Sequence, residues 1–391
     1  MNLCFVIQRY GLEVAGGAER HCRWLAERLA RSHQVSVETT CALDYITWKN
    51  HYPSGRDLVG GIPVTRHPVQ KARSERHFAL ISDLVFHEPH APEDEERWVR
   101  ENGPRSPLLL RALETRRDVD LFLFYCYRYY PSFFGLPLVR DRAVLVPTAE
   151  EDPAVRLPVF GPLFRSPRGI LYLTPEEQEL VQGVSGNAAV PSVVVGSGVE
   201  IPPGFEAIDV RSRFSLPEKY LLYVGRIDRN KGVDHLVHHY LELLREREDT
   251  PPLVLAGKPV LEIHDPRIRV LGVVSEEEKF ALLAGCEVLL MPSAYESLSI
   301  IVLEAWAIGR PVLANAACRV LEGQCQRSGG GLYYRGYREF AETLSRLLDD
   351  PSLRDALGRS GRAYVSAEYE WEAVERRTVG FLESLAKTPR S

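Results

Sequence analysis

Residues 292–312 read Pro-Ser-Ala-Tyr-Glu-Ser-Leu-Ser-Ile-Ile-Val-Leu-Glu-Ala-Trp-Ala-Ile-Gly-Arg-Pro-Val, and they predict a polar loop followed by an apolar helix. The apolar residues 288–291 before them predict a strand, and Gly309 and Pro311 predict the end of the helix. A helix that follows a strand this closely directs unpaired N–H groups and a positive dipole end at the loop, which suits a diphosphate. Glu296 and Glu304 can accept hydrogen bonds from hydroxyl groups on either side of it. The stretch therefore predicts a site for a nucleotide sugar.

These two glutamates, with Pro-Ser before them and Leu-Glu-Ala-x-Ala-x-Gly-x-Pro-Val around the second, resemble the Glu-x7-Glu signature of retaining glycosyltransferases of family 4. Enzymes of this group 1 type have the GT-B fold. The resemblance implies that Glu296 acts on the donor sugar or on the developing positive charge, and that Glu304 contacts the ribose. It also implies donor binding at Ser299 and Ile300, and retention of the anomeric configuration. An ordinary amphipathic helix with a solvated Glu304 is the alternative.

Residues 225–232, Gly-Arg-Ile-Asp-Arg-Asn-Lys-Gly, follow another apolar run and resemble the family's Gly-Arg-x4-Lys-Gly element. Arg226 offers a planar fork and Lys231 a mobile point charge, and both can neutralise a diphosphate leaving group. Stabilising that charge lowers the barrier to breaking a sugar–diphosphate bond. We therefore expect Arg226 and Lys231 to be catalytic together with Glu296. A surface turn with solvated charges is the alternative.

Three further glycine positions are assigned to donor binding by resemblance. The Gly-Gly-Ala-Glu loop at residues 16–19 resembles an N-terminal loop of the family, and Gly17 and Gly225 would let the backbone approach the donor. In the family a turn like the one at Gly272 and Val273 cups the base, whereas by itself it reads equally well as a capped turn. Many members also carry a histidine in the N-terminal domain. Acidic residues occupy that place here, and Glu150 is the candidate replacement.

Apolar runs of strand length alternate with amphipathic runs of helix length, which predicts an α/β protein with parallel sheets. Pro202, Pro203 and Gly204 suggest a linker. We expect two facing, doubly wound Rossmann-like domains, residues 1–200 for the acceptor and residues 201–370 for the donor. A last helix, residues 371–391, would pack back on the first domain. Residues 44–118 give no clear pattern.

Composition excludes several classes of protein. The net charge of −5 over 391 residues argues against a nucleic-acid binder. No apolar run approaches ~20 residues, and the N-terminus lacks a signal-peptide pattern. Seven cysteines without a Cys-x-x-Cys pair suit a reducing compartment. We find no Asp-x-Asp pair placed after a strand and no histidine cluster with ligand spacing, so no metal site is expected. We expect a cytoplasmic protein with no metal and no cofactor beyond its donor.

The predicted function is transfer of a hexose from a UDP-glucose-like or GDP-mannose-like donor to a glycan, a lipid-linked or a small-molecule acceptor. A non-catalytic nucleotide- or carbohydrate-binding protein on the same fold is the alternative. A Rossmann oxidoreductase is a third possibility, weakened because the spacing Gly-x-Gly-x-x-Gly is absent. The basic residues 20–31 with Trp24 allow peripheral contact with the inner face of a membrane, although packing of that helix on a sheet is the simpler interpretation.

Overall fold

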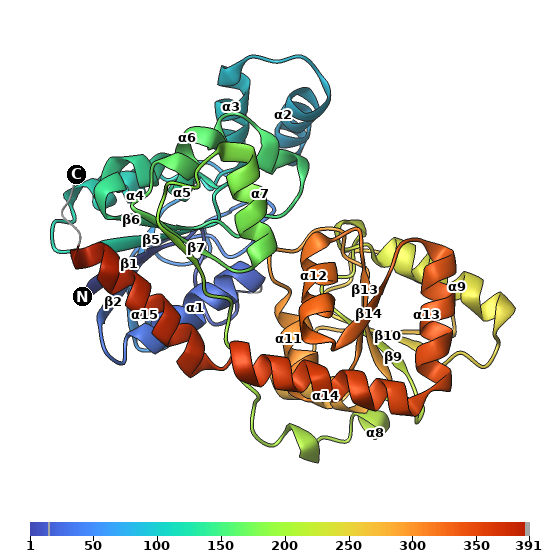
Figure 1. The fold of residues 1–391 in the computed structure, drawn as a ribbon. Coiled ribbons are helices and arrows are strands. Elements are labelled where there is room, and N and C mark those ends of the chain that lie inside the picture. The colour runs from blue at the N-terminus through green and yellow to red at the C-terminus, as the bar shows by residue number, and fades with distance from the viewer. Residues whose placement is uncertain (15, 388–391) are drawn as a thin grey trace. The chain divides into compact units, whose positions relative to one another are not determined.

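The computed structural model describes residues 1–14 and 16–387, and these fall into two compact units. The first unit comprises Met1–Gly196 together with the segment that begins at Val374, and the second comprises Ser197–Ala373 (Figure 1). The division after Gly196 lies a few residues before the expected boundary at residue 200. Each unit is an α/β layer structure with its own sheet and core, as the alternating apolar runs predict.

The sheet of the first unit contains eight strands in the described part of the chain, in the order β3-β4-β2-β1-β5-β6-β7-β8. All neighbours are parallel except β3 and β4, which form an antiparallel pair at one edge. The strands are β1 Asn2–Val6, β2 Gln34–Thr40, β3 Gly55–Val59, β4 Ile62–His67, β5 Leu121–Tyr125, β6 Ala143–Val146, β7 Gly169–Tyr172 and β8 Ser192–Val194. Strands β1, β5, β6 and β7 are almost wholly buried, as expected for a parallel sheet covered on both faces.

The helices of the first unit include three in the region that the sequence left unassigned. The α-helices are α1 Gly17–Leu29, α2 Glu75–His87, α3 Pro92–Asn102, α4 Pro107–Thr115, α5 Tyr130–Gly135, α6 Phe160–Arg165 and α7 Pro175–Ser185. The short 3-10 helices are η1 Leu136–Arg142 and η2 Pro153–Arg156. Helices α2, α3 and α4 lie within residues 44–118, and Trp98 of α3 joins the apolar core of the unit.

Helix α1 uses its apolar side chains inside the first unit. Leu25, Ala26 and Leu29 are buried, and Arg20 lies over the ring of Trp24. Across the helices of residues 1–14 and 16–387, we find none with both the length and the apolar character that crossing a bilayer requires. The buried stripe favours the simpler interpretation of residues 20–31, in which the helix packs on the sheet.

Helix α15, Trp371–Lys387, begins in the second unit and continues into the first. In the first unit the main-chain oxygen of Leu385 accepts a hydrogen bond from Arg168, and Arg377 donates to the main-chain oxygen of Val195 at 3.0 Å. A Cβ atom on Gly169 would lie only 2.5 Å from Leu385 Cδ1, so the helix packs directly on β7.

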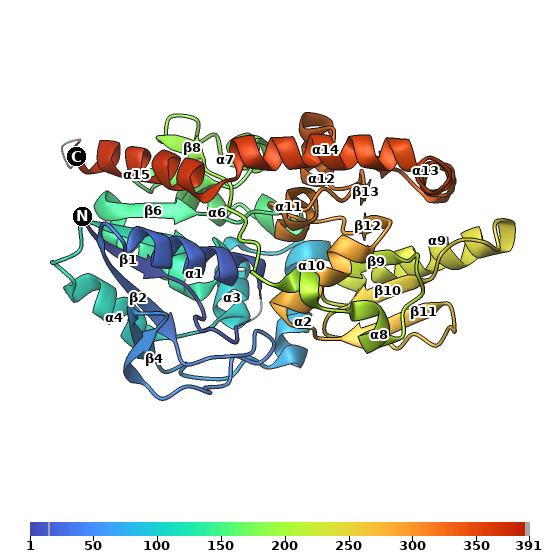
Figure 2. The same ribbon diagram turned by 90° about the horizontal axis from the view of Figure 1, so that it is seen from below.

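The second unit has a six-stranded, fully parallel sheet in the described chain, in the order β11-β10-β9-β12-β13-β14. The strands are β9 Leu221–Val224, β10 Leu253–Ala256, β11 Ile268–Gly272, β12 Val288–Met291, β13 Val312–Asn315 and β14 Gly331–Tyr334. The helices are η3 Phe205–Ala207, α8 Val210–Phe214, η4 Arg229–Lys231, α9 Val233–Glu246, α10 Glu276–Gly285, α11 Ile300–Ala307, α12 Arg319–Ser328, α13 Tyr337–Asp349 and α14 Pro351–Glu368 (Figure 2). Helices α9 and α13 share one apolar core with the strands.

Candidate active site

The candidate site lies at the carboxyl edge of the second unit's sheet. Strands β9 and β12 are parallel neighbours, so the loops that follow them emerge side by side. Two observations show how close these loops are. Lys231 Nζ lies 2.7 Å from Glu296 Oε1. A Cβ atom on Gly232 would lie 2.6 Å from the main-chain oxygen of Pro292. The sheet order therefore brings together two motifs that are far apart in the sequence.

The loop after β9 fixes both predicted phosphate-binding cations. Asp228 pairs with Arg226 through one carboxylate oxygen, and its other oxygen accepts a hydrogen bond from the Lys231 backbone N–H at 2.9 Å. The main-chain oxygen of Arg226 is held by the Tyr223 hydroxyl at 2.8 Å. Because the side chains of Arg226 and Lys231 remain 29% and 28% exposed, a ligand can still reach them.

Glu296 and Lys231 form an ion pair, and the Glu296 side chain is 13% exposed. The sequence assigned them separately, Lys231 to a diphosphate and Glu296 to the donor sugar. A diphosphate that bound to Lys231 would have to share the ammonium group with the Glu296 carboxylate.

The loop after β12 and the start of α11 carry two buried serine hydroxyls and a strained backbone position. Ser299 adopts φ 65°, a left-handed conformation that costs free energy in a residue with a side chain. The hydroxyl groups of Ser293 and Ser299 are buried, and neither has a hydrogen-bond partner among the described residues. Buried polar groups are nearly always paired, so unpaired hydroxyls at the N-terminus of a helix indicate a place for an external acceptor such as a phosphate.

Two amide side chains hold the loop between β12 and α11 through hydrogen bonds to its main chain. Gln324 Nε2 donates to the main-chain oxygen of Leu298 at 2.7 Å, and Asn315 Nδ2 donates to that of Pro292 at 2.9 Å. The loop is thereby tied to β13 and α12 at both of its ends. Sequence reasoning missed both residues because neither belongs to a charged motif.

Glu304, the predicted ribose contact, is buried and already paired with a lysine. Its side chain is 2% exposed, and Oε1 lies 2.7 Å from Lys279 Nζ, on α10. Lys279 is also buried and reaches Glu276 Oε2 at 2.7 Å. The structure excludes a solvated Glu304 and adds Lys279 to the site. No sequence signal singled out Lys279, because the pair depends on how two helices pack.

The glycines at the sheet edge have different roles. A Cβ atom on Gly257, which follows β10, would lie 1.9 Å from the main-chain oxygen of Gly225, so Gly257 is required for the close approach of the two loops. The main-chain oxygen of Gly272, one of the two predicted base contacts, accepts from the Gly257 N–H at 2.7 Å. The other predicted contact, Val273, is 78% exposed.

The remaining predicted residues, Gly17 and Glu150, lie in the first unit. Gly17 is the exposed first residue of α1, and a Cβ atom there would meet no atom within 4 Å. Glu150 follows β6 and lies 3.9 Å from Arg128, which also pairs with Asp152 at 2.6 Å. Glu150 therefore belongs to an acidic and basic cluster, and its role as the replacement for a histidine stays a prediction.

Glu177 supports the loop that carries Glu150. One of its carboxylate oxygens accepts from the Ala149 N–H and the other from the Leu173 N–H, both at 2.6 Å. Burial raises the pKa of Glu177 to about 8, although these two N–H groups act in the opposite direction. Thr148, in the same loop, has a left-handed φ of 48°.

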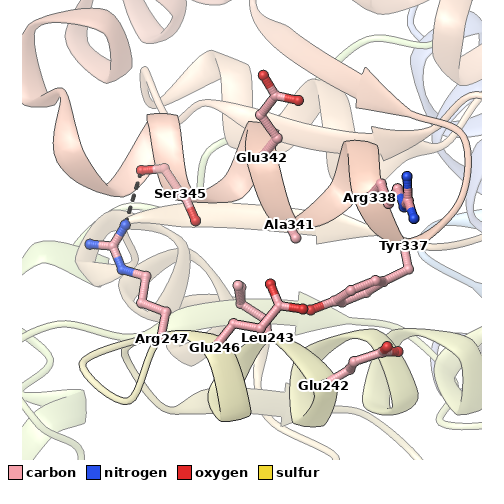
Figure 3. A pocket seen from close by; sticks show the side chains of 9 residues that line it. All are labelled: Glu242, Leu243, Glu246, Arg247, Tyr337, Arg338, Ala341, Glu342 and Ser345. Carbon is pink, nitrogen blue, oxygen red and sulfur yellow. Dashed lines mark hydrogen bonds between the residues drawn. The ribbon is translucent and has the colours of Figure 1, made fainter.

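A shallow groove of about 610 Å³ lies elsewhere in the second unit, between α9 and α13 (Figure 3). Three glutamates, Glu242, Glu246 and Glu342, line it together with Arg247 and further residues of both helices. It does not include the strand-end loops. Within the described ranges we find no cluster of three or more His, Cys, Asp or Glu residues arranged to hold a metal ion.

Comparison with known proteins shows what the second unit is similar to. Residues 218–350 match the family model of glycosyl transferases group 1. Alpha-D-kanosaminyltransferase of Streptomyces kanamyceticus is 29% identical over 194 residues, which cover 45% of this chain and 49% of that protein. That match therefore spans about half of the relative's length. Glycogen synthase of Mycobacterium tuberculosis is 25% identical over 97% of this chain and 93% of its own length.

A solved structure supports the fold along the whole chain. The trehalose-6-phosphate structure from E. coli, bound with UDP-2-fluoro glucose, superposes with a TM-score of 0.72 over 100% of both chains at 12% sequence identity. The fold class read from the sequence is confirmed, and so is the resemblance to glycosyltransferases of the group 1 type. The chain therefore has the GT-B fold, and residues 218–350 of its second unit match the family model of glycosyl transferases group 1.

Proposed function

We propose that the protein is a retaining glycosyltransferase that moves a hexose from a nucleotide sugar to a sugar-containing acceptor. The observation that carries the proposal is the combination at the edge of β9 and β12. Two anchored, accessible cations lie in the loop after β9, and two unpaired buried serine hydroxyls lie in the loop and helix start after β12. This combination suits a diphosphate, and the glutamates beside it suit the hydroxyl groups of the attached sugar and ribose.

In this proposal Arg226, Lys231 and the start of α11 stabilise the negative charge that develops on the diphosphate as the sugar bond breaks. Glu296 acts on the donor hydroxyls or on the developing positive charge. Glu304 binds the ribose. Retention requires the leaving group and the acceptor to share one face of the sugar, so that the diphosphate itself can take the acceptor's proton.

The donor is proposed to be UDP-glucose-like or GDP-mannose-like, and a structural neighbour bound with UDP-2-fluoro glucose supports the first alternative. The acceptor is proposed to be a glycan, a lipid-linked sugar or a small molecule. The cations and the helix start supply the positive charge that a metal ion would otherwise provide, so we propose that transfer does not require a divalent metal.

A second candidate is a non-catalytic nucleotide- or carbohydrate-binding protein on the same fold. The cluster of Glu150, Asp152 and Arg128 favours it, since many family members carry a histidine at this place. Such a protein would bind a nucleotide sugar without releasing the nucleotide.

Incubation with UDP-glucose and GDP-mannose, followed by quantification of free UDP and GDP, separates the two candidates. The transferase should release one nucleotide steadily, and Lys231→Ala should abolish most of that release. Lys219→Ala, a change at an exposed lysine of the same unit, serves as the control. Tight binding of a donor without catalytic release would favour the second candidate.

A further inference from the structure

The buried ion pair between α10 and α11 extends the donor site. Lys279 Nζ and Glu304 Oε1 are 2.7 Å apart, and their side chains are only 6% and 2% exposed. Lys279 lies on the helix that precedes β12, and Glu304 lies on the helix that follows it. The ammonium group also contacts Glu276 Oε2 at 2.7 Å, so it is held from two sides.

The contribution of this buried ion pair to folding stability does not by itself explain why two charged residues occur here. The neighbours of Glu304 on α11 are Leu303 and Ala305, both completely buried. Removing two charges from water costs several kcal/mol, and a well-packed apolar pair at such a place is often as stable as an ion pair. An unpaired Glu304 would be far worse, because a lone buried carboxylate has no compensating charge. The pair therefore indicates that an ionised carboxylate is needed at this position.

Lys279 also determines what that carboxylate can do. Each carboxylate oxygen can accept more than one hydrogen bond. The contact of Oε1 with a lysine that is itself held by Glu276 restricts the rotation of the carboxylate plane. An ionised and oriented carboxylate is an acceptor suited to the hydroxyl groups of a ribose.

We propose that Lys279 is a positioning residue that holds Glu304 ionised and oriented to accept hydrogen bonds from the ribose of the donor nucleotide. This inference rests on the proposed function. Lys279 itself makes no contact with the reacting atoms. Its loss should weaken the nucleotide in the ground state and in the transition state alike, and should therefore raise KM for the donor while leaving kcat nearly unchanged.

The test compares ribose recognition in two lysine variants. Calorimetry measures the binding of UDP and of 2′,3′-dideoxy-UDP to the wild type, Lys279→Met and Lys279→Arg. In the wild type the missing hydroxyls should weaken binding roughly tenfold or more, as expected for hydrogen bonds to a charged group. Lys279→Met should bind UDP about as weakly as the wild type binds the dideoxy analogue, and should no longer distinguish the two ligands. Lys279→Arg should largely preserve the distinction.

A double variant separates positioning from folding. Lys279→Met combined with Glu304→Leu removes both buried charges, so the thermal midpoint should recover relative to Lys279→Met alone. Recognition of the ribose should remain absent in this double variant. Return of ribose recognition in this double variant would overturn Glu304 as the ribose acceptor, and with it the positioning role of Lys279.

The outcomes distinguish this inference from the function on which it rests. Full ribose discrimination in folded Lys279→Met would overturn the positioning role and leave the proposed function intact. If the wild type prefers GDP, the same comparison is made with GDP and its 2′,3′-dideoxy analogue. A wild type that binds neither UDP nor GDP would overturn the proposed function and the inference together.

Discussion

Replacing Glu296 with glutamine is expected to tighten the binding of UDP and to slow sugar transfer at the same time. Glu296 Oε1 lies 2.7 Å from Lys231 Nζ. UDP lacks the transferred hexose that Glu296 is proposed to contact, so in this complex the carboxylate only competes with the phosphates for the same ammonium group. Glutamine keeps the size of the side chain but removes the competing charge.

The structure sets the size of the expected gain. The side chains of Lys231 and Glu296 are 28% and 13% exposed, so solvent screens the ion pair. Its net interaction free energy is therefore at most about 1 kcal/mol. A difference of 1.4 kcal/mol is tenfold in affinity, so UDP should bind about two- to fivefold more tightly to Glu296→Gln. Transfer should fall roughly a hundredfold, as expected when a charge that stabilises the transition state is removed.

Calorimetric titration with UDP and a turnover assay with the preferred donor measure the two effects. Glu342→Gln removes the same charge from an exposed position in the groove between α9 and α13, and it controls for the change in net charge. Weaker UDP binding in Glu296→Gln would show that Lys231 does not bind the phosphates. Unchanged turnover would show that Glu296 has no part in the chemistry.

Three further perturbations address the charge, the backbone and the pH dependence. Lys231→Ala should reduce transfer roughly a hundredfold while shifting the thermal midpoint by only a few degrees, because a part-exposed pair contributes little to folding; near wild-type turnover would contradict this. Gly257→Ala should destabilise the second unit by about 2 kcal/mol or more in urea unfolding, because its Cβ would lie 1.9 Å from the Gly225 oxygen. Gly336→Ala is the control: its φ of 81° is also positive, but the added Cβ would meet no atom within 4 Å, so this change should cost less stability. Because burial raises the pKa of Glu177 from 4.5 to about 8, the folded state holds this proton where the unfolded state has lost it. As far as this group is concerned, the free energy of unfolding of the first unit should be highest below pH 4.5 and should fall by at most roughly 5 kcal/mol as the pH rises to 8. Glu177→Gln should flatten this dependence of stability on pH, and an equally steep dependence in the variant would contradict the assignment.

The sequence predicted those parts of the fold that depend on local pattern. The strand at residues 288–291 and the helix after residue 299 follow from an apolar run, a polar loop and the terminating Gly309 and Pro311, and the structure has β12 and α11 there. The closeness of Lys231 and Glu296 goes beyond local pattern, because it depends on β9 and β12 being neighbours in the sheet.

Features that depend on packing between distant segments could not be predicted. Residues 44–118 mix proline, glycine and charge, so neither period dominates, and the edge strand β3 is exposed along most of its length. The Lys279–Glu304 pair requires knowledge of how α10 and α11 meet. The need for glycine at position 257 appears only when the Gly225 oxygen is placed beside it.

The division of the chain also bears on its synthesis. The second unit is one continuous segment, Ser197–Ala373, whereas the first unit includes residues on both sides of it. A ribosome therefore releases all of the second unit before it releases the helix that covers Gly169 and receives the hydrogen bond from Arg168. Domains usually fold in order from the N-terminus during translation. Here the later segment can reach its native state first, while the earlier one keeps an apolar surface exposed until residues beyond Val374 emerge, and in that interval it is open to chaperones and to aggregation.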